Sequence, residues 1–297
     1  MLERLNKCPL CKSGHFLNDR EITDHAVSKE NFIICKCTQC QLLFTNPRPT
    51  QEEIEPYYEF PEYYSHQNST TTFTEKIYNR VRKINIHKKI KLIESLVPKG
   101  SILDYGCGTG SLLFAFKTRG WVVEGIEPNK SARKLASKTT GQKINKSLDP
   151  KHYNSTFDII TLFHVLEHIH ELRKGIKGIK KSLKKNGYLL LAVPNHQSYE
   201  AKKYKDFWAG WDVPRHLYHF SQTSMQNLAE EFGFTIVETK PMIFDSYYVS
   251  LLSEKYQKPN GNLASHYLKA LTTGWKSNQG AKETQEYSSL LYLLKKK

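Results

Sequence analysis

A short stretch in the middle of the chain combines a carboxylate with closely spaced glycines. Residues 102–110 read Ile-Leu-Asp-Tyr-Gly-Cys-Gly-Thr-Gly, so an apolar strand ends on Asp104 and leads into a glycine loop. Glycines at a strand end permit a sharp turn and let a ligand approach the backbone closely. A dinucleotide would rest its pyrophosphate on such a loop, where the negative charge of Asp104 is poorly placed. The loop therefore favours a positively charged nucleoside over NAD.

A second acid supports a nucleoside ligand. Residues 121–127 form an apolar strand that ends on Glu127, 21 residues after Gly106, and an acid at this distance commonly binds ribose hydroxyls. S-adenosylmethionine is a nucleoside with an ammonium and a sulfonium and without phosphate, so we predict this methyl donor as the cofactor. The residues predicted to bind it are Asp104, Gly106, Cys107, Gly108, Gly110, Glu127, Pro128, Phe163 and His164.

A third apolar strand, residues 157–163, runs into His164-Val-Leu-Glu-His168. Together with Asp-x-Gly-Cys-Gly-x-Gly, this pattern resembles the class I S-adenosylmethionine-dependent methyltransferases over about residues 100–240. The resemblance implies an α/β, Rossmann-like, doubly wound and mostly parallel seven-stranded sheet. The same five residues match an inverted zinc-peptidase signature, which we reject because they follow a strand rather than lie within a peptidase helix.

The stretch around Glu167 raises the question of a second metal. Quinone O-methyltransferases, to which this region is similar, hold magnesium here with carboxylates and a histidine. His164 replaces the first of those carboxylates, and magnesium prefers oxygen ligands. Whether His164, Glu167 and His168 hold a metal therefore stays open. The alternative is that Glu167 and His168 cap a helix and face the substrate cleft, with His168 as a catalytic residue.

Five of the six cysteines lie within the first 40 residues. They form one knuckle, Cys8-x-x-Cys11, and one cluster, Cys35-x-Cys37-x-x-Cys40. Paired knuckles can close a tetrahedral thiolate site, and a reducing compartment disfavours disulfides. Cys37, unlike Cys35, has the two-residue gap to Cys40, so we predict Cys8, Cys11, Cys37 and Cys40 as ligands of a structural zinc. Free thiols or a redox pair are the alternative.

The segment after the cysteines is rich in proline and aromatic residues. Phe44-Thr-Asn-Pro-Arg-Pro49 is followed by Tyr57, Tyr58, Phe60, Tyr63 and Tyr64. A cysteine knuckle followed by this pattern resembles the N-terminal part of the deoxysugar C-methyltransferases, over about residues 8–64. The resemblance implies a small acceptor from sugar-nucleotide or glycan metabolism. The tyrosines suit a lid over a sugar or phenol, or they pack the cysteine-rich segment against the main domain.

Residues 195–220 form a long segment rich in Trp, Tyr and His at the ligand end of the predicted sheet. Long segments in this place are usually functional. The deoxysugar C-methyltransferases carry a Tyr-x-Glu-His stretch here, whose histidine acts as the base. His216 matches that histidine by position, whereas Arg215 and Val213 replace the glutamate and the tyrosine. We predict His216 as a base for an acceptor hydroxyl and Arg215 as a contact for an anionic substrate group, with a structural His216 as the alternative.

These residues need an alternation of strands and helices to position them. Helical spacing predicts a helix over residues 73–97, and strands are expected at 101–104, 122–126, near Ile144, at 157–163, 188–193 and 234–237. A basic helix over 172–185 and a serine-capped helix from Ser221 separate the later strands. Residues 287–294 have the apolar density of a last strand, placed antiparallel beside Phe234. Such alternation predicts a parallel sheet covered on both faces.

Three segments follow from these patterns. Residues 1–48 are predicted as a zinc ribbon, 49–97 as a Tyr-rich linker and helix, and 98–297 as the methyltransferase domain. Within that domain, 195–220 is the substrate-side loop. Residues 245–284 are expected to be an insertion without chemistry of its own.

The composition limits the partners. The formal net charge is +15, but lysines and arginines are spread over many segments that look like surface helices, so solvated faces are favoured over a nucleic-acid footprint. No apolar run approaches a membrane span, and no apolar stretch precedes Cys8, which predicts a cytoplasmic protein without a membrane span. The partner expected is a small methyl acceptor, which the basic field allows to be anionic. The alternatives are an RNA methyltransferase that uses the ribbon and the basic surface, and a non-catalytic interaction protein with a degenerate domain. The oligomeric state stays open.

Overall fold

The computed structural model of the chain describes residues 1–58 and 73–297, and the side chains of 73–79 are outside this description. The predicted lid residues Phe60, Tyr63 and Tyr64 therefore lie outside the described residues. No described helix is both long enough and apolar enough to cross a membrane.

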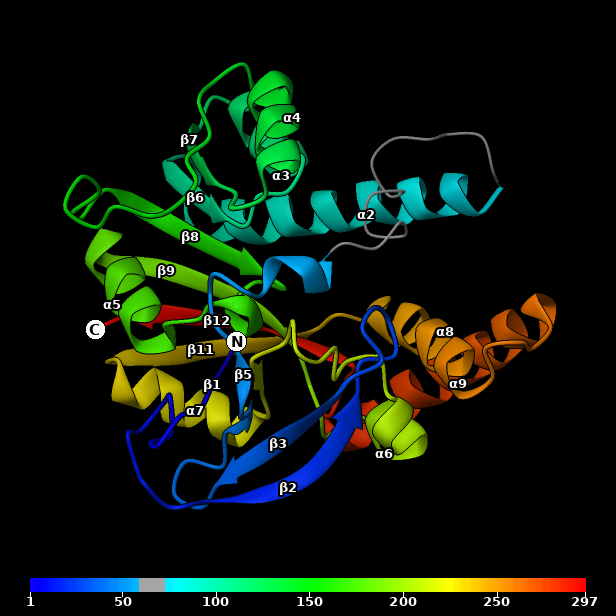
Figure 1. Cartoon of the computed structure of the whole chain (residues 1–297). Coiled ribbons are helices and arrows are strands. Elements are labelled where there is room, and N and C mark those ends of the chain that lie inside the picture. Colours follow the sequence, from blue (N-terminus) through cyan, green and yellow to red (C-terminus); the bar gives the residue numbers. More distant parts are fainter. Residues whose placement is uncertain (59–72) are drawn as a thin grey trace.

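A central sheet of six described strands carries the fold (Figure 1). Its order is β11-β12-β9-β8-β6-β7. The strands are β6 (Ser101–Tyr105), β7 (Val122–Ile126), β8 (Phe157–Phe163), β9 (Leu183–Pro194), β11 (Phe234–Pro241) and β12 (Ser289–Lys296). The run β7-β6-β8-β9 is parallel, while β12 pairs antiparallel with both β9 and β11. The predicted Rossmann-like α/β class and the placement of the last strand are confirmed.

The predicted count of seven strands is wrong for the described residues. The stretch near Ile144 forms only one bridge, between Ile126 and Asn145, instead of a strand. Ile144 is the single apolar residue between Gly141 and Leu148, so only one side chain is available to anchor this stretch in the core.

The two faces of the sheet are covered by different helices because successive strand side chains point in opposite directions. Leu189 and Leu191 of β9 belong to the core shared with α5 (Leu172–Ser182) and α7 (Gln222–Glu231). Leu190 and Ala192 belong to the core shared with α2 (Phe73–Leu96) and α3 (Ser111–Lys117). On the same side as α3 lies α4 (Lys130–Thr140), which packs beside α3 through Ala136 (Figure 1).

The N-terminal part forms a second sheet that includes a strand from far along the chain. Its order is β10-β4-β3-β2, built from β2 (Phe16–Thr23), β3 (Asn31–Cys37), β4 (Leu43–Thr45) and β10 (Tyr218–His219). The short pair β1 (Leu2–Glu3) and β5 (Arg48–Pro49) stands beside it. Since β10 belongs to the predicted substrate-side loop, the boundary drawn at residue 48 does not separate two independent sheets.

The predicted substrate-side loop is largely ordered and buried. It contains α6 (Tyr199–Tyr204), the 3-10 turn η3 (Lys205–Phe207) and β10. Trp208 and Trp211 pack into a core with Ile22, Phe32 and Ile34 of the N-terminal sheet. Most of its aromatic residues thus join the ribbon to the main domain instead of facing a ligand.

The remaining described elements are two 3-10 turns and two helices. The N-terminal part ends in the 3-10 turn η1 (Glu55–Tyr58), and η2 (Leu166–His168) follows β8 directly. The expected insertion consists of the paired helices α8 (Asp245–Gln257) and α9 (Leu263–Thr284), on the right in Figure 1. The helix predicted over 172–185 ends at Ser182, because the chain already joins the sheet at Leu183, opposite Phe157.

Candidate functional site

The glycine loop sits between β6 and α3 at the carboxyl end of the parallel strands. Gly106, Gly108 and Gly110 all have positive φ, at 75°, 54° and 76°. A Cβ on Gly106 would lie 2.3 Å from Val165, whereas a Cβ on Gly108 would meet nothing within 4 Å. Gly106 is therefore required by packing, and Gly108 leaves open space in which a ligand can reach the backbone.

Asp104 ends β6 as a buried carboxylate with one strong partner. Its side chain accepts a 2.6 Å hydrogen bond from the Thr161 hydroxyl on β8, and only 5% of the residue is exposed. Burial raises the pKa of Asp104 to about 6, against the opposing effects of Thr161 and of the Lys89 ammonium. The site thus offers a desolvated negative charge to a cationic ligand.

Glu127 follows β7 and clamps the glycine loop. Its two carboxylate oxygens accept hydrogen bonds from the backbone N–H groups of Gly108, at 2.8 Å, and Asn129, at 2.9 Å. Burial raises the pKa of Glu127, although both backbone bonds and Arg133 oppose the shift. The loop and the second acid are therefore one hydrogen-bonded unit.

The other predicted donor-binding residues divide into three kinds. Cys107 is buried, and its side chain packs beside Gly125 in the core. Pro128 is exposed, and its carbonyl accepts a hydrogen bond from Arg133. Phe163 and His164 are half-buried at the end of β8, next to the glycine loop.

Lys89 is a part of this site that the sequence patterns did not indicate. Its ammonium lies 3.4 Å from the centroid of the Phe163 ring. Burial lowers the pKa of Lys89 to about 8, while Asp104 and Asp245 favour the charged form. Lys89 belongs to α2, a helix whose surface is strongly basic, so nothing in the local sequence separated it from the solvated lysines around it.

The four cysteines predicted to bind zinc lie together. One possible ligand atom from each of Cys8, Cys11, Cys37 and Cys40 lies within 4.8 Å of the others. The closest sulfur pairs, Cys8 with Cys40 and Cys11 with Cys37, are both 3.5 Å apart. Cys35 points elsewhere, toward Asn18 and the carbonyl of Asn46.

Past the end of β8, His164 turns toward the predicted insertion. Its Nε2 lies 3.0 Å from Asp245, the first residue of α8, and its Nδ1 lies 3.6 Å from Glu167. Burial disfavours the imidazolium, but both carboxylates outweigh burial and raise the pKa of His164 to about 10. The segment expected to lack chemistry thus contributes Asp245 to the site.

His168 and His216 face each other beside Glu167. Their ring centroids are 4.8 Å apart, and Nε2 of His216 lies 4.0 Å from Glu167 and 3.8 Å from Asp212. Burial lowers the pKa of His168 to about 4, and the charge of His216 acts in the same direction. The hydroxyl of Tyr58 lies 3.0 Å from Nδ1 of His168, so the segment after the cysteines also reaches this cluster.

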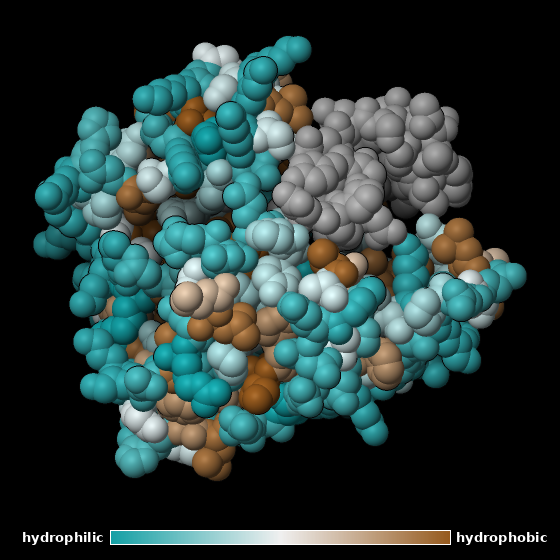
Figure 2. All heavy atoms as spheres, in the orientation of Figure 1, coloured by the Kyte–Doolittle hydropathy of each residue, from teal (hydrophilic) through white to brown (hydrophobic). Residues whose placement is uncertain are grey.

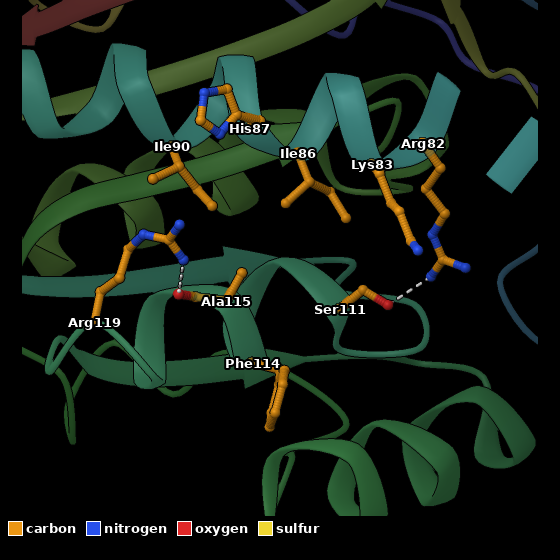
Figure 3. Close-up of a pocket in the computed structure, with 9 residues that line it drawn as sticks. All are labelled: Arg82, Lys83, Ile86, His87, Ile90, Ser111, Phe114, Ala115 and Arg119. Carbon is orange, nitrogen blue, oxygen red and sulfur yellow. Dashed lines mark hydrogen bonds between the residues drawn. The ribbon is translucent and has the colours of Figure 1, made fainter. Parts of the chain in front are cut away.

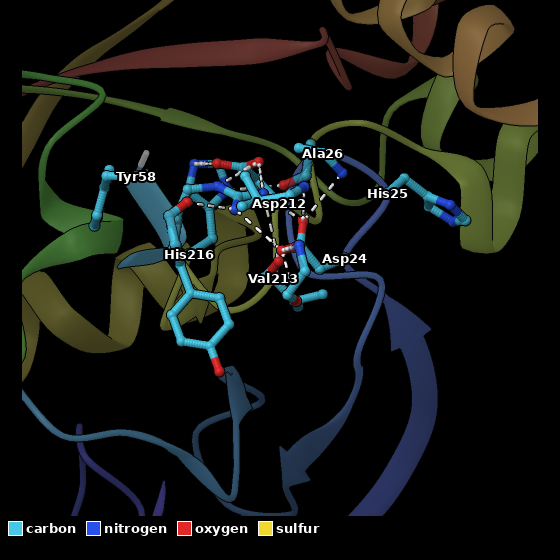
Figure 4. Close-up of polar contacts among 12 residues, drawn as sticks. Asp24, His25, Ala26, Tyr58, Asp212, Val213 and His216 are labelled. Carbon is cyan, nitrogen blue, oxygen red and sulfur yellow. Dashed lines mark hydrogen bonds and ion pairs between the residues drawn. The ribbon is translucent and has the colours of Figure 1, made fainter. Parts of the chain in front are cut away.

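Arg215 does not face a substrate, which corrects the expectation that it contacts an anionic group. Its side chain is 3% exposed and forms ion pairs with Asp24, at 2.9 Å, and with Asp212, at 2.8 Å. Figure 4 shows Asp24 and Asp212 within this group of polar contacts. Burial opposes the ionised form of Asp212, but Arg215 and His216 lower its pKa to about 2. A guanidinium satisfied in this way has little capacity left for a ligand.

The residues at 164, 167 and 168 do not fit the magnesium site that the quinone methyltransferase resemblance implies. Magnesium takes oxygen ligands in octahedral geometry. Glu167 is the one carboxylate among the three positions, and His164 is directed to Asp245.

A groove of about 450 Å³ lies elsewhere, between α2 and α3 (Figure 3). None of the predicted donor-binding residues lines it. Arg82 bridges its two helices by hydrogen bonds to Thr109 and Ser111. The groove is therefore lined neither by the predicted donor-binding residues nor by Glu167, His168 and His216.

Comparisons with known proteins agree with this geometry. A family model described as a methyltransferase domain matches residues 78–239. The ubiquinone biosynthesis O-methyltransferase of Rickettsia canadensis is 25% identical over 183 residues, which cover 56% of this chain and 76% of that protein. The corresponding protein of Rickettsia prowazekii is 23% identical over 211 residues, covering 66% and 82%. The structure of magnesium protoporphyrin IX methyltransferase from Synechocystis PCC 6803 with bound SAH superposes with a TM-score of 0.52 at 14% identity, covering 81% of this chain and 97% of that one.

Proposed function

The chain belongs to the methyltransferase-domain family and is a class I S-adenosylmethionine-dependent methyltransferase, and from this premise we propose that it methylates a hydroxyl group of a small molecule. The observation that carries the proposal is the position of the histidine cluster. This cluster consists of Glu167 and His168, which follow β8, and of His216, whose ring packs against that of His168. The neighbour of β8, strand β6, supplies Asp104 and leads into the glycine loop. Donor and acceptor would then meet at the carboxyl edge of the sheet, where ligands of such sheets bind.

We propose that three charged side chains and the glycine loop hold the donor. Asp104 would attract the donor's ammonium, since a desolvated carboxylate lies there beside open space at Gly108. Glu127 would exchange its bond from the Gly108 N–H for the ribose hydroxyls. Lys89 would pair with the donor's carboxylate, because its ammonium is held near Asp104 and over Phe163.

Methyl transfer at an activated sulfonium depends mainly on alignment. The acceptor oxygen would attack the methyl carbon as the carbon–sulfur bond breaks and its electron pair stays on sulfur. The hydroxyl proton must leave, and we assign it to Nε2 of His216. Nδ1 of His216 lies 2.9 Å from the carbonyl oxygen of Gly210, so Nδ1 must carry the ring proton and Nε2 the lone pair. His168 lies beside it as a second imidazole.

The acceptor is proposed at the level of chemical class. The N-terminal pattern supports a sugar nucleotide or glycan precursor, and the Rickettsia relatives are O-methyltransferases of ubiquinone biosynthesis. Both classes offer a hydroxyl on a ring that Tyr58 can contact by stacking. A screen should therefore include sugar nucleotides and catechol-type phenols.

The donor and the base can be tested separately. Calorimetry should show S-adenosylmethionine binding by the wild type and a loss of at least tenfold in affinity for Asp104→Ala. Unchanged affinity in this variant would refute the donor site.

The His216→Gln variant should bind the donor normally, but its rate of methyl transfer should be lower by about 10²–10⁴-fold, the usual contribution of a general base.

We also propose that the four clustered cysteines hold a structural zinc. The support is the approach of four sulfurs from two knuckles, with no other described group among them. Four thiolates fill a tetrahedral zinc site and leave no open position, so the ion would stabilise the ribbon without taking part in methyl transfer.

A further inference from the structure

Asp212 lies in the turn before His216 and has an unusual backbone conformation. Its φ is 39°, in the left-handed region that residues with a Cβ seldom adopt, although aspartate tolerates it better than most. The turn is fixed on both sides, because Trp211 is 2% exposed in the core and the N–H of His216 donates to the carbonyl of Asp212 at 2.9 Å. Strained residues that are held in this way cluster at functional sites. The backbone therefore indicates a functional role for this side chain.

The two carboxylate oxygens of Asp212 have different surroundings. Oδ1 accepts hydrogen bonds from Nε and Nη2 of Arg215, at 3.1 Å and 2.8 Å. Arg215 is itself held by Asp24 and by the carbonyl oxygen of Tyr57. Oδ2 lies on the side of His216, 3.8 Å from Nε2 of that ring. Figure 4 shows Asp24, Asp212 and His216 within one group of polar contacts. One oxygen thus fixes the carboxylate, and the other is presented to the imidazole.

His216 presents to Asp212 the nitrogen that can take a proton. Nδ1 of His216 already carries a proton, because it lies 2.9 Å from the carbonyl oxygen of Gly210, which only accepts hydrogen bonds. A second proton must therefore go to Nε2, where the new N–H would face Oδ2 of Asp212. A charge-assisted N–H···O bond is about 2.7–2.9 Å long, so the pair would close by roughly 1 Å on protonation. Catalytic hydrogen bonds are often long in the free enzyme and tighten in the complex.

The two other imidazoles around His216 add no charge to it at neutral pH. The ring centroids of His168 and His219 lie 4.8 Å and 6.5 Å from that of His216. Burial lowers the pKa of His168 to about 4 and holds that of His219 well below its usual range. The charged groups that face His216 in the described part of the chain are therefore the carboxylates of Glu167 and Asp212.

Of these two carboxylates, Asp212 is the better partner for a protonated His216. Glu167 approaches Nε2 to 4.0 Å with Oε1, the same oxygen that faces His164 at 3.6 Å. His164 is an imidazolium, so Oε1 of Glu167 is already shared with a cation. The cation that neutralises Asp212 binds Oδ1 instead and leaves Oδ2 to His216.

From these contacts we infer that Asp212 is a positioning residue for methyl transfer, which orients His216 and stabilises the imidazolium formed when Nε2 takes the acceptor proton. Its part in transfer rests on the proposed function, whereas the pairing of the two side chains does not. Burial opposes ionisation of Asp212, but Arg215 and His216 hold its pKa at about 2, so this carboxylate is too weak a base to take the proton itself. The proton therefore stays on Nε2 while the methyl group is transferred.

The same contacts connect the N-terminal sheet to the base. Asp24 lies in the turn after β2 and pairs with Arg215, which pairs with Asp212. Arg215 thus fixes the carboxylate from behind, in place of the substrate contact expected from its sequence position. The N-terminal part would in this way hold the base in position, independently of any metal at its cysteines.

The pairing can be tested by NMR on the full chain with ¹³C- and ¹⁵N-labelled histidines, without donor or acceptor. His216→Gln identifies the His216 signals by their loss. In the wild type, the neutral ring should be the tautomer with the proton on Nδ1. In Asp212→Asn, the ring should change from neutral to charged at a pH about 1 unit lower, because a nearby carboxylate favours the cation. An equal transition in both proteins, or a wild-type proton on Nε2, would overturn the inference.

Two further variants make this measurement specific. Asp212→Gly also removes the carboxylate and suits the left-handed φ, so it should show the same shift even if the asparagine variant does not fold. Asp206→Asn is the matched control, since Asp206 lies exposed in the same segment and should leave the His216 transition unchanged. A shift as large in Asp206→Asn as in Asp212→Asn would overturn the specific pairing.

The consequence for transfer can be measured with labelled S-adenosylmethionine and catechol, a phenol of the proposed class. Asp212→Asn should lower kcat by about 10–100-fold, less than the loss of the base itself, with unchanged donor affinity in calorimetry. In the His216→Gln background, Asp212→Asn should lower kcat by no more than about twofold, because Asp212 acts through the imidazole. A further tenfold loss in this double variant would overturn the inference.

The two measurements separate this inference from the proposed function. The NMR titration decides the pairing whether or not catechol is methylated. A shifted transition without any loss of transfer would overturn the part of Asp212 in transfer, together with the base role of His216. Failure of the wild type to bind the donor in calorimetry would instead contradict the donor site.

Discussion

We propose that donor recognition depends on Asp104, and the environment of this carboxylate would then make recognition dependent on pH. A carboxylate that must be ionised to bind a cation loses affinity when it is protonated. With a pKa of about 6 in the free protein, Asp104 is ionised above pH 6 and becomes neutral below it. Affinity for S-adenosylmethionine should therefore be highest above pH 6 and fall by up to ~10-fold per pH unit below it.

Calorimetry between pH 5 and 8 would check this, with Asp104→Asn as the matched variant. The variant should bind weakly at every pH and show no such slope. Lys89→Met should move the midpoint to higher pH, because the Lys89 ammonium favours ionisation of Asp104. A wild-type affinity that does not change across this range would contradict the assignment.

The cysteines permit an equally direct test at the residue scale. Cys37→Ser should lose the bound zinc, since its sulfur lies 3.5 Å from that of Cys11 within the cluster. Cys35→Ser should keep the zinc, because the Cys35 sulfur contacts Asn18 and Asn46 instead. Elemental analysis of the two purified variants gives the answer, and equal metal loss in both would show that the ligand assignment is wrong.

At the scale of elements, the turn between β2 and β3 supports the histidine cluster through one buried ion pair. Asp24 is 0% exposed at its side chain and Arg215 is 3% exposed. Burial opposes ionisation of Asp24, but Arg215 outweighs it and lowers the pKa of this carboxyl. Its stabilising effect should be full above pH 4, the ordinary range of an unfolded aspartate, and disappear as the pH falls through the lowered value.

Asp24→Asn should lower the free energy of unfolding by about 3 kcal/mol, since Arg215 would keep a buried charge with fewer partners. Urea unfolding at neutral pH measures this. Asp19→Asn in the same hairpin is the control, because Asp19 pairs with Arg20 at a more exposed position and should cost less than about 1 kcal/mol. An equal loss of unfolding free energy in the two variants would mean that the buried ion pair stabilises the fold no more than the exposed one.

The sequence predicted those elements that local patterns encode. Glycine spacing and apolar runs placed β6, β7 and β8 correctly, and Ser221 caps α7 as expected, in a capping box with Ser224. Contacts between distant segments were inaccessible. The two-residue strand β10 has no pattern of its own, and Arg215 looked available because its partners Asp24 and Asp212 meet it only after folding.

The candidate site divides in the same way. The acids and glycines of the proposed donor site follow strand ends within one stretch of chain, so their spacing could indicate them. Lys89, Asp212 and Asp245 come from three other elements, and each resembles ordinary surface charge in the sequence. Only the packing of α2, of the segment before β10 and of α8 around the end of β8 brings them to the site.

For the molecule as a whole, the formal net charge of +15 could attract nucleic acid. The face in Figure 2 is mostly hydrophilic, with hydrophobic residues scattered over it. Several surface cations are paired, among them Lys174 with Glu171 and Lys184 with Asp158. We therefore expect only weak, salt-sensitive RNA binding, with a Kd of about 10⁻⁴–10⁻⁶ M at physiological salt.

Filter binding with transfer RNA and an unstructured RNA over a salt series would measure this. Similar weak affinity for both is the expected result. Much tighter binding to one of them, lost in Cys37→Ser, would instead favour an RNA methyltransferase that uses the ribbon.

The position of β12 between β9 and β11 has a consequence for how the protein is made. β11 has no other neighbour in the described sheet, and β9 lacks one edge partner until β12 arrives. During translation β9 and β11 therefore cannot be joined into one sheet before residues 289–296 have emerged from the ribosome. Until then one edge of β9 and both edges of β11 lack a partner strand in the described sheet, and such edges can pair wrongly with other chains. This enzyme should consequently depend on chaperones for longer than a protein whose strands pair in the order of synthesis.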